Sequence, residues 1–76
     1  MSGRAVYQFR VEGRLDEFTF DAAEDLTLTV EHALTGQAVT TLTATLADQG
    51  ALVALIKLLH DSGVSLLAIQ RLDPLP

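Results

Sequence analysis

The chain of 76 residues (8.2 kDa) is long enough for one small domain, 1–76, with an ordered core over about residues 4–72, and its 49% apolar and 20% charged residues exclude an intrinsically disordered chain. Ten acidic residues against five scattered basic ones give a net charge of −5, which argues against binding to nucleic acids or anionic membranes, because both need clustered cations. The absence of cysteine excludes disulfides, thiolate metal sites and cysteine nucleophiles.

The first half of the chain contains two segments in which apolar and polar residues alternate. Residues 5–12 place Tyr7, Phe9 and Val11 on one side, and residues 26–32 repeat the pattern with threonines on the polar side. Alternation with period two is typical of a strand that is buried on one face, and threonine suits such a pleated surface. Both segments are therefore predicted to be strands.

The second half predicts a hairpin, a helix and a last strand. A short connection at 34–37 leads into a strand over 38–46. Asp48 is a good N-cap for a helix over 49–62, in which leucines and an isoleucine recur at helical spacing. The last strand, 64–72, is apolar on both faces.

The segment 14–25 fits two structures. Leu15, Phe18 and Ala22 fit one stripe of a helix, whereas Phe18 and Phe20 on either side of Thr19 fit a strand. We favour a short, irregular helix, with an extra strand as the alternative.

With that helix, the fold class is α+β and the order is β-α-β-β-α-β, which predicts a single-domain ferredoxin-like sandwich. The strands that begin at residues 5 and 38 would form a central parallel pair, the strands at 26 and 64 would form the edges, and both helices would cover one face. The alternative is a five-stranded sheet with one helix at 49–62.

The other face of such a sheet would be lined by threonines from the two hairpin strands. If two copies closed on each other through this face, they could enclose a ligand cavity, and the residues that we expect to line it are Gln8, Arg10, Thr41 and Thr43. No residue there is identified as a catalytic acid or base.

The helix and the last strand carry more apolar side chains than a chain of this size can bury. Surplus apolar surface usually marks an interface. We expect self-association, with a dimer favoured, or docking to a protein partner through Val53, Leu58, Leu66 and Ala68.

Charged and polar clusters give weaker signals. The acidic residues Asp16, Glu17, Asp21, Glu24 and Asp25 form a solvated face or a docking site for a basic partner. The run His60-Asp61-Ser62 holds the residue types of a hydrolytic triad, but consecutive residues diverge, whereas a triad needs convergence. His32 and His60 lack a second ligand at metal-binding spacing. We therefore predict no catalytic, cofactor or metal site.

Membrane and export signals are not found either. The longest near-apolar stretch, 51–59, contains Lys57 and is far shorter than the roughly 20 residues that span a bilayer. No basic-then-apolar leader opens the chain, because polar residues from Gln8 onward interrupt it. We expect a soluble cytoplasmic protein.

Residues 42–73 resemble a group of small bacterial α/β proteins. The shared features are the helix start Asp-Gln-x-Ala-Leu at 48–52 and a leucine-rich strand that ends in a basic residue, and residues 11–16 match more loosely. Those proteins carry tryptophans after a Leu-Asp pair, where Phe18 and Phe20 stand here. The resemblance implies a bacterial origin and one compact domain, and it transfers no activity.

These patterns leave three hypotheses. The first is a small non-catalytic protein-association domain, either homo-oligomeric or an accessory subunit of a larger bacterial system. The second is a dimeric ligand-binding or catalytic α+β barrel that uses the threonine face. The third is an acidic antagonist of a basic partner protein.

Overall fold

The computed structural model describes residues 4–15 and 18–72, and it holds four strands and one helix over them. In chain order these are β1 (Ala5–Glu12), β2 (Ala23–His32), β3 (Ala38–Leu46), α1 (Gln49–Asp61) and β4 (Ser65–Arg71). The predicted strands at 5–12 and 38–46 are confirmed at both ends. The predicted helix ends one residue earlier, and β2 begins three residues earlier than the alternation indicated.

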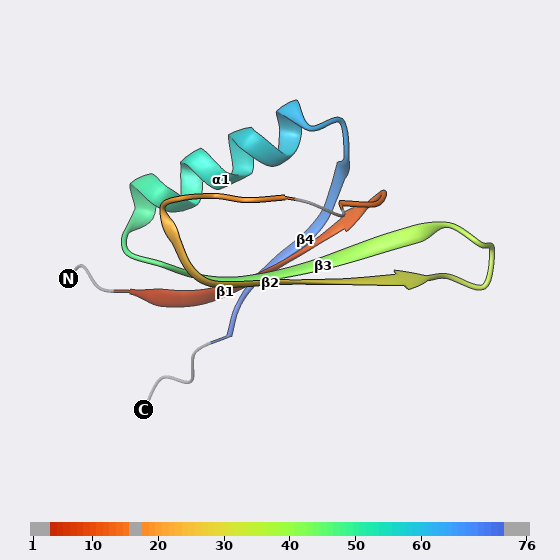
Figure 1. Cartoon of the computed structure of the whole chain (residues 1–76), viewed down its shortest axis with the longest axis horizontal. Helices are drawn as coiled ribbons and strands as arrows, with labels where there is room; N and C mark the ends of the chain where they lie inside the picture. The colour runs from red at the N-terminus through yellow and green to blue at the C-terminus, as the bar shows by residue number, and fades with distance from the viewer. Residues whose placement is uncertain (1–3, 16–17, 73–76) are drawn as a thin grey trace.

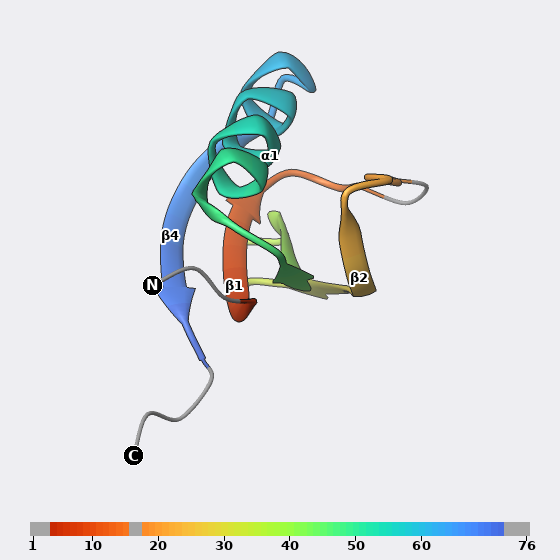
Figure 2. The same cartoon turned by 90° about the vertical axis from the view of Figure 1, so that its left-hand side faces the viewer.

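The strands form one sheet in the order β2-β3-β1-β4, in which all neighbours are antiparallel. Helix α1 and the connection from β1 to β2 lie on the same side of this sheet, and no described element covers the other side (Figures 1 and 2). The hairpin of β2 and β3 extends beyond the helix and gives the molecule its longest dimension, 42 Å.

The predicted ferredoxin-like β-α-β-β-α-β sandwich is wrong. The described residues contain one helix rather than two, and the central strands β1 and β3 run antiparallel rather than parallel. The positions of the strands in the sheet were predicted correctly, with β1 and β3 central and β2 and β4 at the edges. The five-stranded alternative predicted one helix correctly, but the described chain has four strands.

The segment 14–25 adopts neither predicted structure. Its last three residues belong to β2, where Ala23 pairs with Leu46 and Glu24 pairs with Thr45. The part before them is a connection without regular structure in its described residues; its side chains Leu15, Phe18 and Phe20 are half-buried against the core. Burial of these three side chains against the sheet therefore replaces the packing that a first helix would have supplied.

One buried hydroxyl fixes the start of this connection. The Thr40 side chain is fully buried in β3, and its Oγ1 donates a hydrogen bond to the Gly13 carbonyl oxygen at 2.7 Å. The same oxygen accepts from the Leu15 backbone N–H at 3.2 Å. Two backbone groups at the start of the connection thus find a partner on a distant strand.

The core lies between the sheet and α1. It is formed by apolar side chains of the two central strands and of the helix, namely Phe9, Val11, Leu42, Ala44, Leu46, Leu55 and Leu59. Each of these is almost completely shielded from solvent. The Asp48 carboxylate accepts from the Ala51 N–H at 2.9 Å, which confirms the predicted cap of α1.

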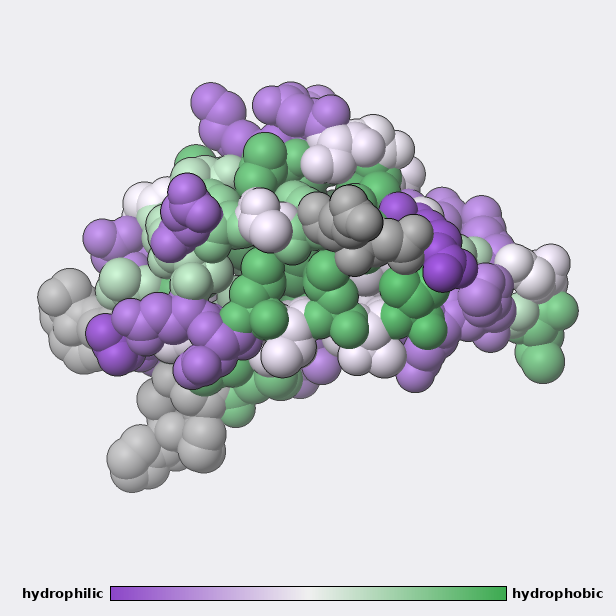
Figure 3. Space-filling view, viewed as in Figure 1, coloured by the Kyte–Doolittle hydropathy of each residue, from purple (hydrophilic) through white to green (hydrophobic). Residues whose placement is uncertain are grey.

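The edge strand β2 is less well covered. Its inward side chains Leu26, Leu28 and Val30 are half-buried, and apolar side chains gather along β2 at the front of the molecule (Figure 3). The absence of a first helix over the described part of the connection explains why these side chains stay partly accessible.

We expect Thr40→Val to lower the free energy of unfolding by about 1–3 kcal/mol, because it leaves the Gly13 carbonyl and the Leu15 N–H without their shared partner. Thr40→Ser keeps the hydroxyl and loses only a methyl group, so its loss should be about 1 kcal/mol. Urea unfolding followed by circular dichroism measures both. A Val variant as stable as the wild type would contradict the structural role of the hydroxyl.

Gly13→Ala should be more harmful than Gly36→Ala. Gly13 has a φ of +125°, and an added Cβ would lie 3.0 Å from the Cγ1 atom of Val64. Gly36 has a φ of +89° with nothing within 4 Å of an added Cβ. We expect losses of about 2–3 kcal/mol and about 1 kcal/mol, respectively, from thermal unfolding. Equal losses would show that the contact with Val64 has no effect on stability.

Candidate interaction surfaces

Strand β4 is the most exposed element of the sheet. It lies at the sheet edge, and all seven of its residues are exposed to solvent. The large apolar side chains on and directly after it are exposed by 40% (Leu66), 52% (Leu67), 40% (Ile69) and 38% (Leu72). We call these four residues the β4 apolar patch. Such a concentration of apolar surface on one strand is typical of an interface.

A bulge decides which face each residue of β4 occupies. Residues opposite each other in a ladder share a face, so Ile69, opposite Phe9, lies on the helix side, and Ala68, opposite Arg10, lies on the other side. The register shifts between Arg10 and Val11, and Val11 then pairs with Leu66. Because Val11 is buried beneath α1, Leu66 also lies on the helix side, apart from Ala68.

The two helical members of the predicted interface do not form one surface. Val53 and Leu58 are 55% and 37% exposed. Five residues of α-helix turn through about 500°, which leaves these two side chains about 140° apart around the axis. Leu55 and Leu59 face the sheet, so Val53 points away from it. The predicted set Val53, Leu58, Leu66 and Ala68 is therefore exposed, but it is spread over several sides of the molecule.

Sequence reasoning missed part of the β4 patch. Leu67 and Ile69 were expected on the buried side of the last strand, and Leu72 was not singled out. The useful signal was the unbroken apolar run from Leu66 to Ile69, which a strand buried on one face does not need. Leu34, fully exposed at the tip of the hairpin, was also missed, and nothing in its local pattern marks it.

The predicted ligand face is brought together by the sheet. Gln8 lies opposite Thr43, and Arg10 lies opposite Thr41 on the central strands. Thr27 and Thr29 of β2 extend the same rows. The four predicted residues alternate with Phe9, Val11 and Leu42, which are buried in the core, so they lie on the opposite side of the sheet. No described element covers that side (Figure 2). A single copy therefore presents them on an open surface, and a cavity there would need a second molecule to close it.

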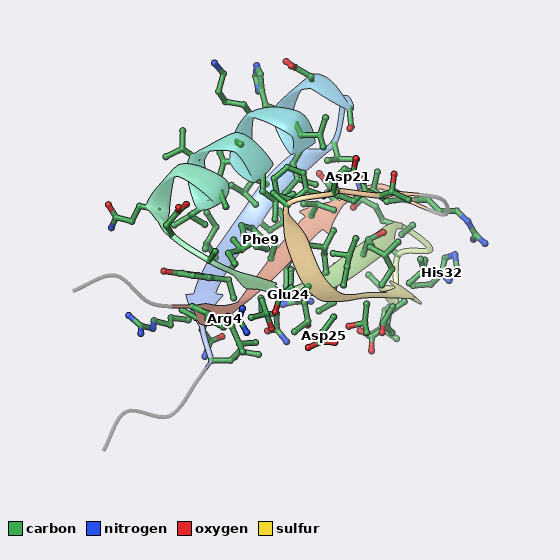
Figure 4. The ribbon with its side chains drawn as sticks, turned by 60° about the vertical axis from the view of Figure 1, so that its left-hand side comes forward. Arg4, Phe9, Asp21, Glu24, Asp25 and His32 are labelled. Carbon is green, nitrogen blue, oxygen red and sulfur yellow. The ribbon has the colours of Figure 1, made fainter. Side chains whose placement is uncertain are left out.

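The acidic residues do not gather into one site. Asp16 and Glu17 lie outside the described residues. Glu24 accepts from Arg4 at 3.0 Å, and Asp25 has a φ of 50° where the register of β2 shifts. Asp21 lies apart from both, at the turn before β2 (Figure 4). Of the three described carboxylates, one already neutralises an arginine, so this region is poorly arranged to dock a basic partner.

Metal and membrane sites are not found in the part of the chain that the structure describes. No group of three His, Cys, Asp or Glu side chains lies close enough to hold a metal ion over residues 4–15 and 18–72. His32 lies at the end of β2 next to the hairpin tip, whereas His60 is exposed in the last turn of α1 (Figure 4). No helix among the same residues has the length and apolar character needed to cross a membrane.

Comparison with known proteins identifies one family. The chain belongs to the family described as a domain of unknown function (DUF8691), whose model matches residues 6–70 and so covers β1 to nearly the end of β4. No curated protein and no solved structure matches the chain. The match covers both the β4 apolar patch, except Leu72, and the threonine face, and it assigns neither of them a role.

We expect Glu24→Gln to lower the free energy of unfolding by less than about 1 kcal/mol, because both partners of the Arg4–Glu24 pair are more than half exposed. The difference should shrink further in 1 M salt, which screens exposed charges. Asp21→Asn is the matched control. A Glu24→Gln loss that is large and independent of salt would contradict a simple surface ion pair.

Proposed function

We propose that this member of the family is a protein-association domain that assembles with itself, most simply as a dimer, and that the β4 apolar patch lies in the interface. The observation that carries the proposal is that every residue of β4 is exposed. An edge strand whose seven residues are all exposed, with four large apolar side chains on it or directly after it, is costly to leave in water.

The energy available from covering the patch is adequate for association. Complete burial of a leucine or isoleucine is worth about 1.5–3 kcal/mol, and each of these side chains still exposes between 38% and 52% of its surface. Covering the rest of all four therefore contributes about 4 kcal/mol per copy. Backbone pairing along the open edge would add to this.

Association is better supported than the two other hypotheses. A ligand site on the threonine face would need Gln8, Arg10, Thr41 and Thr43 to be enclosed, and in one copy they lie on an open surface. An acidic antagonist would need a shared acidic surface, and the described carboxylates are separated or paired with Arg4. A homo-oligomer and an accessory subunit of a larger system use the same β4 surface, and they differ only in the partner.

The cellular setting of this proposal comes from the sequence. The resemblance over residues 42–73 supports a bacterial protein, and a chain without cysteine needs no oxidising compartment to fold. The proposed setting of the dimer is therefore the bacterial cytoplasm.

Light scattering coupled to size exclusion over a wide concentration range tests the proposal. We expect a mass of twice 8.2 kDa for the wild type. Ile69→Asp should raise the dissociation constant at least tenfold, about 1.4 kcal/mol, because it brings a charge into the interface. Leu34→Asp is the matched control, since Leu34 is more exposed but lies at the hairpin tip.

A wild-type mass that stays at one copy across the whole range would contradict self-association. A dimer that Leu34→Asp weakens as much as Ile69→Asp would contradict the assignment of the interface to β4. Circular dichroism of both variants establishes that the fold is retained.

A further inference from the structure

We propose that two copies join by antiparallel pairing of their β4 strands about a two-fold axis near Ile69, which makes one continuous eight-stranded sheet. This inference rests on the proposed self-association and specifies how it occurs. The interface would combine main-chain hydrogen bonds with the β4 apolar patch, which is the way that extended segments add to an exposed sheet edge.

The direction of the backbone groups of β4 follows from one hydrogen bond. The Leu72 N–H donates to the Val6 carbonyl oxygen at 2.8 Å, so the backbone N–H and carbonyl of Leu72 point toward β1. In an antiparallel ladder the residues alternate between pairs that exchange hydrogen bonds and pairs that do not. Ala68 and Gln70 therefore also bond toward β1, and the N–H and carbonyl of Ile69 point to the open edge.

The two edges of the sheet differ in how they resist pairing. Natural edge strands are kept from aggregating by charged residues and bulges. The edge strand β2 carries four charged or ionisable side chains, namely Glu24, Asp25, Glu31 and His32, and it is bulged at Asp25. Strand β4 carries one charged residue, Arg71, at its end. Its bulge lies at Leu67, which leaves the stretch from Ala68 onward regular.

A second copy is the occupant that this edge fits. With the axis at Ile69, each Ile69 lies opposite its counterpart, Ala68 lies opposite Gln70, and Arg71 lies opposite Leu67. The Arg71 side chains of the two copies, which carry the only charges of β4, therefore do not lie opposite each other. The acidic residues of the sheet's edge strands lie on β2, at the opposite edge, so β4 itself brings no acidic side chain to the place where two copies meet.

The symmetry of the pair also brings part of the apolar patch together. A two-fold axis perpendicular to the sheet leaves both α1 helices on the same side of it. Ile69, which lies on the helix side of β4, then meets the same side chain of the second copy, and Leu66 lies on that side too. These are two of the residues that the single chain leaves 40% exposed.

The first experiment uses single cysteines, since the natural chain has none. Opposed residues of a hydrogen-bonded pair have Cα atoms about 5.5 Å apart, which suits a disulfide. Ile69→Cys should therefore give a covalent dimer under mild oxidation. Thr29→Cys on β2 and Val53→Cys on the outer side of α1 are the controls and should remain monomeric on a non-reducing gel.

The second experiment separates strand pairing from simple apolar contact. Ile69→Pro removes the outward N–H, a change that edge strands tolerate, and should reduce dimer formation at least tenfold more than Ile69→Ala, which keeps that donor. Both are measured by light scattering, with circular dichroism as the check on folding. If Ile69→Pro fails to fold, the cysteine experiment still decides.

The outcomes separate this inference from the proposed function. A wild-type monomer would overturn both. A wild-type dimer in which the Thr29→Cys or Val53→Cys variant cross-links faster than Ile69→Cys, or in which Ile69→Pro and Ile69→Ala act alike, would overturn only the pairing of β4. A mass that keeps growing beyond two copies would also overturn it, because a two-fold contact closes on itself.

Discussion

The buried hydroxyl of Thr40 is the contact on which the arrangement of this chain depends. It joins β3 to the two backbone groups that follow β1, the Gly13 carbonyl and the Leu15 N–H. If this hydroxyl were removed, the Gly13 carbonyl and the Leu15 N–H would have to be satisfied by water or remain unpaired beside the core. One side chain therefore fixes the start of the irregular segment that lies over the sheet.

Coverage of the sheet follows from this constraint. A single helix lies over the central strands, while a connection with three half-buried side chains covers the region toward β2. The helix also contacts β4, yet every residue of this edge strand stays exposed. The sheet is consequently well packed in its centre and open at its edge, and the open edge is the part that carries most of the surplus apolar surface.

Local patterns predicted the bounds of most elements, but they did not predict which face of the sheet each side chain of β4 occupies. The alternation in 5–12 and 38–46, and the cap at Asp48, predicted β1, β3 and α1 to within a residue. The faces of the last strand were predicted less well, because Leu66 and Ala68 were assigned to one face by simple alternation. The bulge at Leu67 inserts one residue and moves Leu66 to the helix side, and a bulge leaves little trace in sequence.

Composition alone excluded thiol chemistry and indicated the excess of apolar residues. Local patterns predicted the central strands and the capped helix, because these depend on neighbours within a few positions. The conformation of the described residues of 14–25, the antiparallel pairing of β1 with β3, and the exposure of Leu67 and Ile69 were evident only in the tertiary structure. These depend on contacts between distant parts of the chain: Gly13 and Thr40 are 27 residues apart. Alternation within a segment indicates that one face is buried, but it does not indicate which distant residues cover that face.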